Sequence, residues 1–188
     1  MKEGCKNWIL VIKYNIAYPR PHPQSFSPPD VDIGWADLPE VYLLGALHGD
    51  DSVGLTVVVD IASLLLEYSW YDSIPSRTSY YNDTDIMAKV EEFRSNLEGR
   101  GVEDVDRRWL SIFFMTRSIF IVPTMNAPEY DHKSCTEDGI DPNQDFPYNL
   151  MDRTLCMRTI YGQTINKIFG DHSFWLSFTF HGGMEAIV

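Results

Sequence analysis

One seven-residue run, VYLLGAL at 41–47, constrains the fold more than any other part of this sequence. It is apolar almost without interruption, which is typical of a strand covered on both faces, because such a strand has no solvent-facing side. Strands of this kind belong mainly to parallel sheets, whose neighbouring strands are joined by crossover connections that are usually helices. The run therefore predicts a sheet with helices on both of its faces.

The rest of the chain alternates between strand-like and helix-like patterns. Strands are predicted at 8–14, 117–123 and 173–180, and helices at 52–67, 85–97 and 152–169. We expect Pro123 to end its strand, and we expect the proline-rich stretch 19–29 and the long polar stretch 124–150 to be loops. The alternation predicts an α/β fold, a three-layer sandwich around a mixed, largely parallel twisted sheet.

Composition limits the classes of function. The 188 residues are 44% hydrophobic, enough for a single globular domain over 1–188. A formal charge of -12 argues against a nucleic-acid partner, because phosphate binding needs clustered lysine and arginine. The apolar runs are too short to span a bilayer. Cys5, Cys135 and Cys156 form no CxxC motif, so neither a disulfide framework nor a cysteine zinc site is indicated.

Polar turns follow two of the predicted strands. HGDD at 48–51 comes directly after the run 41–47, and HGG at 181–183 comes directly after 173–180. The carboxyl ends of parallel strands meet at one edge of a sheet, so His48, Asp51 and His181 can converge there. Catalytic zinc commonly takes three ligands of these types and keeps one position open. The alternative is that each motif is an ordinary turn, which is how we interpret Asp50, with helix N-capping also open to it.

Four blocks of sequence bear on this choice. ALHGDDSVG, IVPTMNAPEY, DGIDPNQDFPYN and LSFTFHGG occur in the order, and with roughly the spacing, of motifs in the zinc carboxypeptidase family, the carboxypeptidase A-like metallopeptidases. The chain resembles that family from about residue 8 to residue 188. The resemblance implies a zinc carboxypeptidase-like catalytic domain, a peptide or protein C-terminus as substrate, and hydrolysis of C-terminal amino acids by zinc-activated water.

The resemblance also implies roles for individual residues. His48, Asp51 and His181 stand at the positions of the zinc ligands, one zinc per chain. Two residues of the third block, Asn143 and Gln144, stand where the family contacts the C-terminal carboxylate of its substrate. In the same block, Asp141 is expected to brace the loop or to hydrogen-bond a zinc-bound histidine.

Three positions depart from the family pattern. Asp51 replaces a glutamate, which shortens the reach of the carboxylate by roughly 1.5 Å and would weaken zinc binding. Gln144 replaces an arginine, which removes a charge-assisted contact to a free carboxylate. Ser134 or Cys135 stands near the expected place of a second arginine, and Lys133 is the only cation close to it.

The family's general-base glutamate is expected beyond Val188, so no catalytic acid–base residue is predicted within the sequence. We expect an incomplete member of the family that lacks the C-terminal part of the domain, with an exposed sheet edge that favours association. One alternative is a catalytically inactive binding protein or fragment. A second alternative is a related zinc amidohydrolase that acts on acylated amino acids. The cellular compartment is left open.

Overall fold

The computed structural model describes residues 8–13, 38–73, 84–102, 109–110, 113, 116–147 and 156–182. The chain divides into two compact units. The first comprises Met1–Ile12, Pro39–Ile61 and Ile119–Val188, and the second comprises Lys13–Leu38 and Ala62–Ser118. The predicted loop at 19–29 lies outside the described residues.

The first unit is built around a four-stranded sheet. Its strands, in spatial order, are β1 (Leu10–Lys13), β3 (Ser118–Thr124), β2 (Glu40–Ala46) and β4 (Phe174–Thr179). The sheet is mixed and mostly parallel, and β2 and β4 run parallel as neighbours, with Leu44 beside Thr179. The four predicted strands and the α/β class are therefore confirmed.

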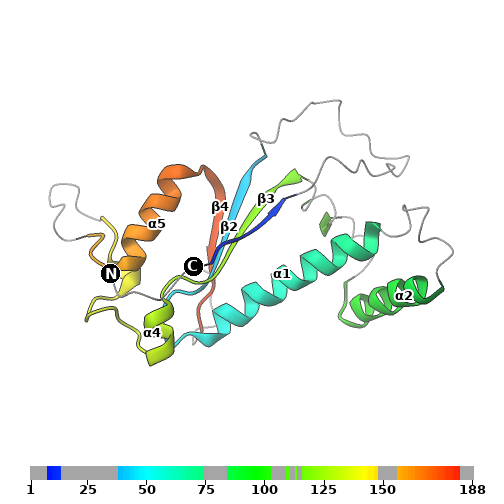
Figure 1. Cartoon of the computed structure of the whole chain (residues 1–188), viewed down its shortest axis with the longest axis horizontal. Coiled ribbons are helices and arrows are strands. Elements are labelled where there is room, and N and C mark those ends of the chain that lie inside the picture. The colour runs from blue at the N-terminus through cyan, green and yellow to red at the C-terminus, as the bar shows by residue number, and fades with distance from the viewer. Residues whose placement is uncertain are drawn as a thin grey trace. The chain divides into compact units, whose positions relative to one another are not determined.

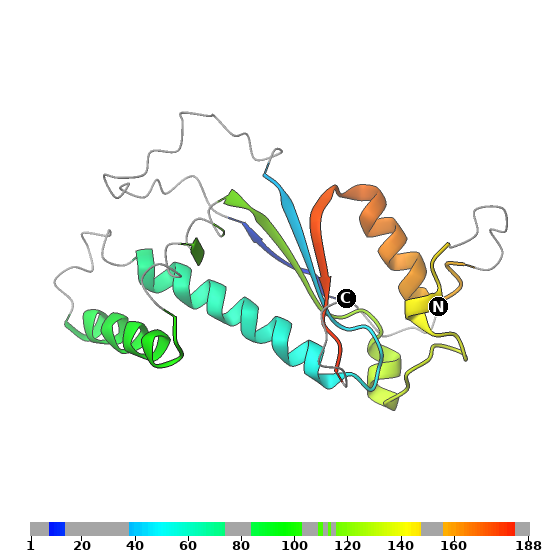
Figure 2. The same ribbon diagram turned by 180° about the vertical axis from the view of Figure 1, so that it is seen from behind.

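Helices cover the sheet of the first unit on both faces. Helix α5 (Ile160–Asp171) lies against one face, and the first turns of α1 (Ser52–Ser73) lie against the other (Figures 1 and 2). The buried cluster on the α5 side comprises Tyr42, Leu44, Leu47, Phe120, Val122, Met125, Tyr161, Ile165 and Ile168. On the α1 side, Gly45 allows close packing, because a Cβ there would lie 2.3 Å from the Pro123 carbonyl oxygen and 2.9 Å from the Leu55 Cα.

The second unit contains the later turns of α1 and the whole of α2 (Thr84–Gly99). Helix α2 confirms the helix predicted at 85–97, and its buried side chains are Val90 and Leu97. The chain leaves α2 through Gly101, whose positive φ of 79° suits a residue without a Cβ.

Two predicted boundaries are wrong. Pro123 does not end its strand, because β3 continues to Thr124. The fixed φ of proline is compatible with extended backbone. Because Pro123 is next to the last residue of β3, its missing N–H removes only one donor from the hydrogen bonds of the sheet. The Thr124 hydroxyl then donates to the Ala46 carbonyl of the neighbouring strand at 3.5 Å.

The helix predicted at 152–169 begins only at Ile160. Met157 has a positive φ of 55°, which an α-helix cannot contain. Thr159 is the N-cap, and its side chain accepts the Gly162 amide N–H at 2.8 Å. Residues 151–155 lie outside the described part of the chain.

The stretch 124–150, predicted as an irregular loop, contains two short helices. Helix α4 spans Ala127–His132, and a 3-10 helix, η3, spans Pro142–Gln144. Each has a proline at its start, where the missing N–H would have no helical partner. We therefore correct this prediction, because the prolines that suggested a loop mark helix starts.

The outer strand β4 exposes large apolar side chains, among them Trp175, Leu176 and Phe178. Among the described residues, no helix has the length and apolar character needed to cross a bilayer.

Candidate metal centre

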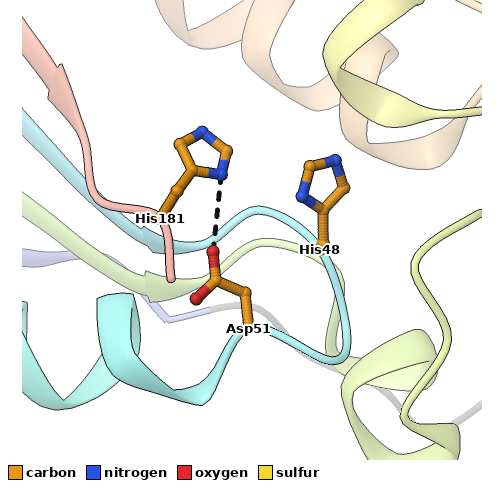
Figure 3. A group of neighbouring side chains, drawn as sticks. All are labelled: His48, Asp51 and His181. Carbon is orange, nitrogen blue, oxygen red and sulfur yellow. Dashed lines mark ion pairs between the residues drawn. The ribbon is translucent and has the colours of Figure 1, made fainter. Parts of the chain in front are cut away.

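Three side chains meet at the carboxyl ends of the neighbouring strands β2 and β4. His48 and Asp51 lie in the turn between β2 and α1, and His181 lies just after β4 (Figure 3). One ligand atom of each residue lies within 4.8 Å of the others. The strand pairing explains this convergence, because the Phe180 amide N–H donates to the Leu44 carbonyl at 2.9 Å and carries His181 alongside the end of β2.

The turn that carries His48 and Asp51 is fixed by backbone contacts. The Asp51 N–H donates to the His48 carbonyl at 3.2 Å, and the Gly49 N–H donates to the Ser134 carbonyl at 2.9 Å. A Cβ on Gly49 would lie 2.1 Å from the Glu129 carbonyl oxygen of α4 and 2.5 Å from the Ser134 carbonyl oxygen, so only glycine fits here. Asp50 is exposed in this turn, as the sequence predicted.

The Asp51 carboxylate is buried, with 7% of its side chain exposed. Its Oδ2 lies 3.4 Å from His181 Nδ1. Within the described part of the chain, its Oδ1 has no hydrogen-bond partner. A buried carboxylate oxygen without a partner is costly, and a bound cation would remove that cost.

The donor set fits a metal ion. Two ligands about 2.0–2.1 Å from one zinc ion at a tetrahedral angle lie roughly 3.3 Å apart, close to the 3.4 Å between Asp51 Oδ2 and His181 Nδ1. The aspartate therefore reaches the second histidine despite its shorter side chain. Gly182 makes room for it, because a Cβ at that residue would lie 2.9 Å from Asp51 Oδ1.

The other side of the His48 ring contacts Asp141. His48 Nε2 lies 3.0 Å from Asp141 Oδ1, while Nδ1 faces Asp51 and His181 (Figure 3). Partial burial raises the pKa of Asp141, but hydrogen bonds from His48, the Asn143 amide and Gln144, with the electrostatic influence of His48, hold it below its ordinary value. An ionised Asp141 accepts a hydrogen bond from His48 Nε2–H, and in that tautomer a neutral His48 presents a lone pair at Nδ1.

Asp141 also organises the 3-10 helix that follows it. Its Oδ1 accepts the Asn143 backbone N–H at 2.9 Å, and its Oδ2 accepts the Gln144 side-chain amide at 2.9 Å. The same carboxylate thus braces its own loop and contacts a site histidine, the two roles that the sequence left open for it. Both Asn143 and Gln144 are exposed.

Two buried carboxylates hold this loop against the start of α5, and the sequence analysis missed both. Asp145 accepts the Thr159 backbone N–H at 2.7 Å and the Thr159 hydroxyl at 2.8 Å. Glu137 accepts the Ile160 N–H at 2.6 Å. Carboxylates are favourable at a helix N-terminus, where backbone N–H groups lack helical partners. The available signal in the sequence was that Glu137 and Asp145 are acidic and lie ahead of the helix start, but both precede Thr159 by more than ten residues.

The segment just after α4 places no cation on the site carboxylates. The Lys133 ammonium lies 4.4 Å from the centre of the Tyr130 ring, and the Ser134 hydroxyl donates to the Thr136 carbonyl at 2.8 Å. The pKa of the Cys135 thiol is raised by partial burial and then by the negative charges of Asp50, Asp141 and Asp51. The surroundings of the site are therefore acidic.

No protein-family model matches this chain, and a search of curated proteins gives no match. The arrangement itself is a group of two histidines and one aspartate that can hold a metal ion.

Proposed function

We propose that this chain carries the metal centre of a zinc-dependent hydrolase of the carboxypeptidase A-like type, which acts on the C-terminal end of peptides. The observation that supports the proposal best is the convergence of His48, Asp51 and His181 within 4.8 Å. The four sequence blocks shared in order with that family support it independently.

The choice of zinc follows from the donor set. Two imidazole nitrogens and one carboxylate oxygen suit zinc better than magnesium or calcium, which prefer oxygen ligands alone. Three protein ligands leave one coordination position for a reactant, as in catalytic rather than structural zinc sites. A zinc ion held there would supply Lewis acidity towards an amide carbonyl and an attacking water molecule.

The protein residues of the site prepare it for such a metal. Asp141 keeps His48 in the tautomer and orientation that present Nδ1 to the site. The buried Asp51 carboxylate supplies negative charge and one unpartnered oxygen. Asn143 and Gln144, anchored on Asp141, are positioned to contact a peptide terminus beside His48.

The test is the zinc content of the purified 188-residue chain, measured by elemental analysis. We expect about one zinc per chain in the wild type and background zinc in a His48→Ala, His181→Ala double variant. A His172→Ala variant is the matched control, because that histidine pairs with Glu40 instead of the site residues. Equal zinc in the wild type and the double variant would refute the proposed metal centre.

A second candidate function is recognition without turnover. It is favoured by the contacts of Lys133 and Ser134, which leave the segment near the expected second arginine without a cation for a scissile carbonyl. The two functions are distinguished by whether the zinc-loaded chain releases amino acids from a synthetic peptide. Release that His181→Ala abolishes would support hydrolysis, and zinc-dependent binding without release would support recognition.

A further inference from the structure

Gln144 adjoins the candidate metal centre through a single shared carboxylate. Asp141 Oδ1 contacts His48 Nε2 at 3.0 Å, and Asp141 Oδ2 accepts the Gln144 amide at 2.9 Å. The exposed Gln144 side chain therefore lies beside the carboxylate that contacts His48.

The contact with Asp141 fixes what Gln144 can offer. A glutamine amide has two N–H donors and one carbonyl acceptor, and one of the donors is used on Asp141. The rest of the exposed side-chain amide thus offers one donor and one acceptor. A primary carboxamide has the complementary pair, an acceptor and a donor. A carboxylate has acceptors only, so one of its oxygens would face the Gln144 carbonyl.

The charges around Gln144 also favour an uncharged amide over a carboxylate as the bound group. Asp51 and Asp141 are carboxylates of the site itself, and Asp50 lies in the adjoining turn. Among the described residues, two cations close to Gln144 in sequence have partners of their own, since Lys133 lies over the Tyr130 ring and Arg158 Nε lies 3.7 Å from Asp145 Oδ1. A free C-terminal carboxylate would add a fourth negative charge to these three, against the two positive charges of a bound zinc ion, whereas an uncharged amide would add none.

We propose that Gln144 selects peptides whose C-terminus is an uncharged amide over peptides that end in a free carboxylate. The inference rests on the proposed function, because it concerns what is bound at the same metal centre.

The experiment compares two small probes, N-acetylphenylalanine amide and N-acetylphenylalanine, for binding to the zinc-loaded full chain by isothermal titration calorimetry. We expect the amide to bind the wild type at least about tenfold more tightly. In a Gln144→Arg variant we expect the preference to reverse by about tenfold or more, since arginine offers a carboxylate a charged, bidentate contact. Asn166→Arg, on an exposed position of α5, adds the same charge elsewhere and is expected to keep the wild-type preference.

Zinc content is measured in the same samples, so the two proposals can fail separately. If the wild-type chain contains one zinc but binds the carboxylate as tightly as the amide, the selectivity is overturned and the metal centre stands. The same holds if the zinc-loaded wild type binds neither probe. A Gln144→Arg preference equal to that of the wild type would also overturn it. Absence of zinc from the wild type would refute the proposed function and with it this inference.

Discussion

The neighbouring strands β2 and β4 carry histidines and carboxylates at both ends, and the two ends differ in how their polar atoms are satisfied. At the amino ends, Glu40 begins β2 and His172 comes just before β4. At the carboxyl ends, His48 and Asp51 follow β2, and His181 follows β4. In both places strand pairing joins residues that are far apart in sequence.

Both carboxylate oxygens at the amino ends have hydrogen-bond partners. His172 Nδ1 lies 3.1 Å and 3.2 Å from the two Glu40 oxygens, and the Ser173 N–H donates to Glu40 at 3.1 Å. The His172 ring also packs on Phe120 and Phe174, with ring centres 4.6 Å and 5.5 Å away. Such a pair holds the two strands together, and each Glu40 oxygen has a partner within the protein.

At the carboxyl ends, by contrast, one carboxylate oxygen has no hydrogen-bond partner among the described residues. Asp51 Oδ1 is buried without a partner among the described residues, and the His48 and His181 rings tilt at 47° to each other with centres 5.3 Å apart. The comparison teaches that residue type does not distinguish a structural histidine–carboxylate pair from a candidate metal site. The distinction lies in which donor and acceptor atoms are left over.

Removing the carboxylate at either end should separate the two roles most clearly. Asp51→Ala is expected to weaken zinc binding by more than about a hundredfold, because a direct ligand is lost, while Glu40→Ala leaves zinc affinity unchanged. Competition with a chromophoric chelator measures both affinities. Equal losses in the two variants would mean that the ends do not differ as described.

Asp141→Asn is expected to weaken zinc binding by about 10–100-fold, because the neutral amide holds the His48 tautomer less firmly than the carboxylate does. Asp171→Asn, an exposed change at the end of α5, is the charge-matched control. The same chelator competition applies. If Asp141→Asn bound zinc like the control, Asp141 would have no part in orienting His48.

Gly182→Ala is expected to weaken zinc binding by about tenfold, because its new Cβ would lie 2.9 Å from Asp51 Oδ1 and displace the carboxylate. Gly170→Ala is the control, since a Cβ there meets nothing within 4 Å. The control should leave zinc affinity unchanged and stabilise α5 by up to about 1 kcal/mol. Unaltered zinc affinity in Gly182→Ala would show that Asp51 does not depend on this space.

The smallest effect is expected at the amino ends. Glu40→Gln should lower the free energy of unfolding by about 1 kcal/mol, because the part-buried pair with His172 loses its charge. Urea denaturation measures this, with Asp60→Asn on the exposed side of α1 as the control. A change in zinc affinity in Glu40→Gln, or a stability equal to that of the control, would contradict a purely structural role for this pair.

The sequence by itself predicted the four strands, the helix at 85–97 and the sheet edge at which His48, Asp51 and His181 meet. The apolar run at 41–47 could only be a covered strand, and the turns HGDD and HGG come directly after predicted strands, so a parallel sheet brings them to one edge. These features are local, because the burial of a strand or helix leaves its own period in the sequence.

Only the tertiary structure decided which polar atoms meet. The helix start at Ile160 depends on Asp145 and Glu137, which approach it from more than ten residues away. The pairing of His172 with Glu40 and the unpartnered oxygen of Asp51 have no local signature. The physical reason is that hydrogen bonds act over about 3 Å in space, and packing of the whole unit sets that proximity independently of sequence distance.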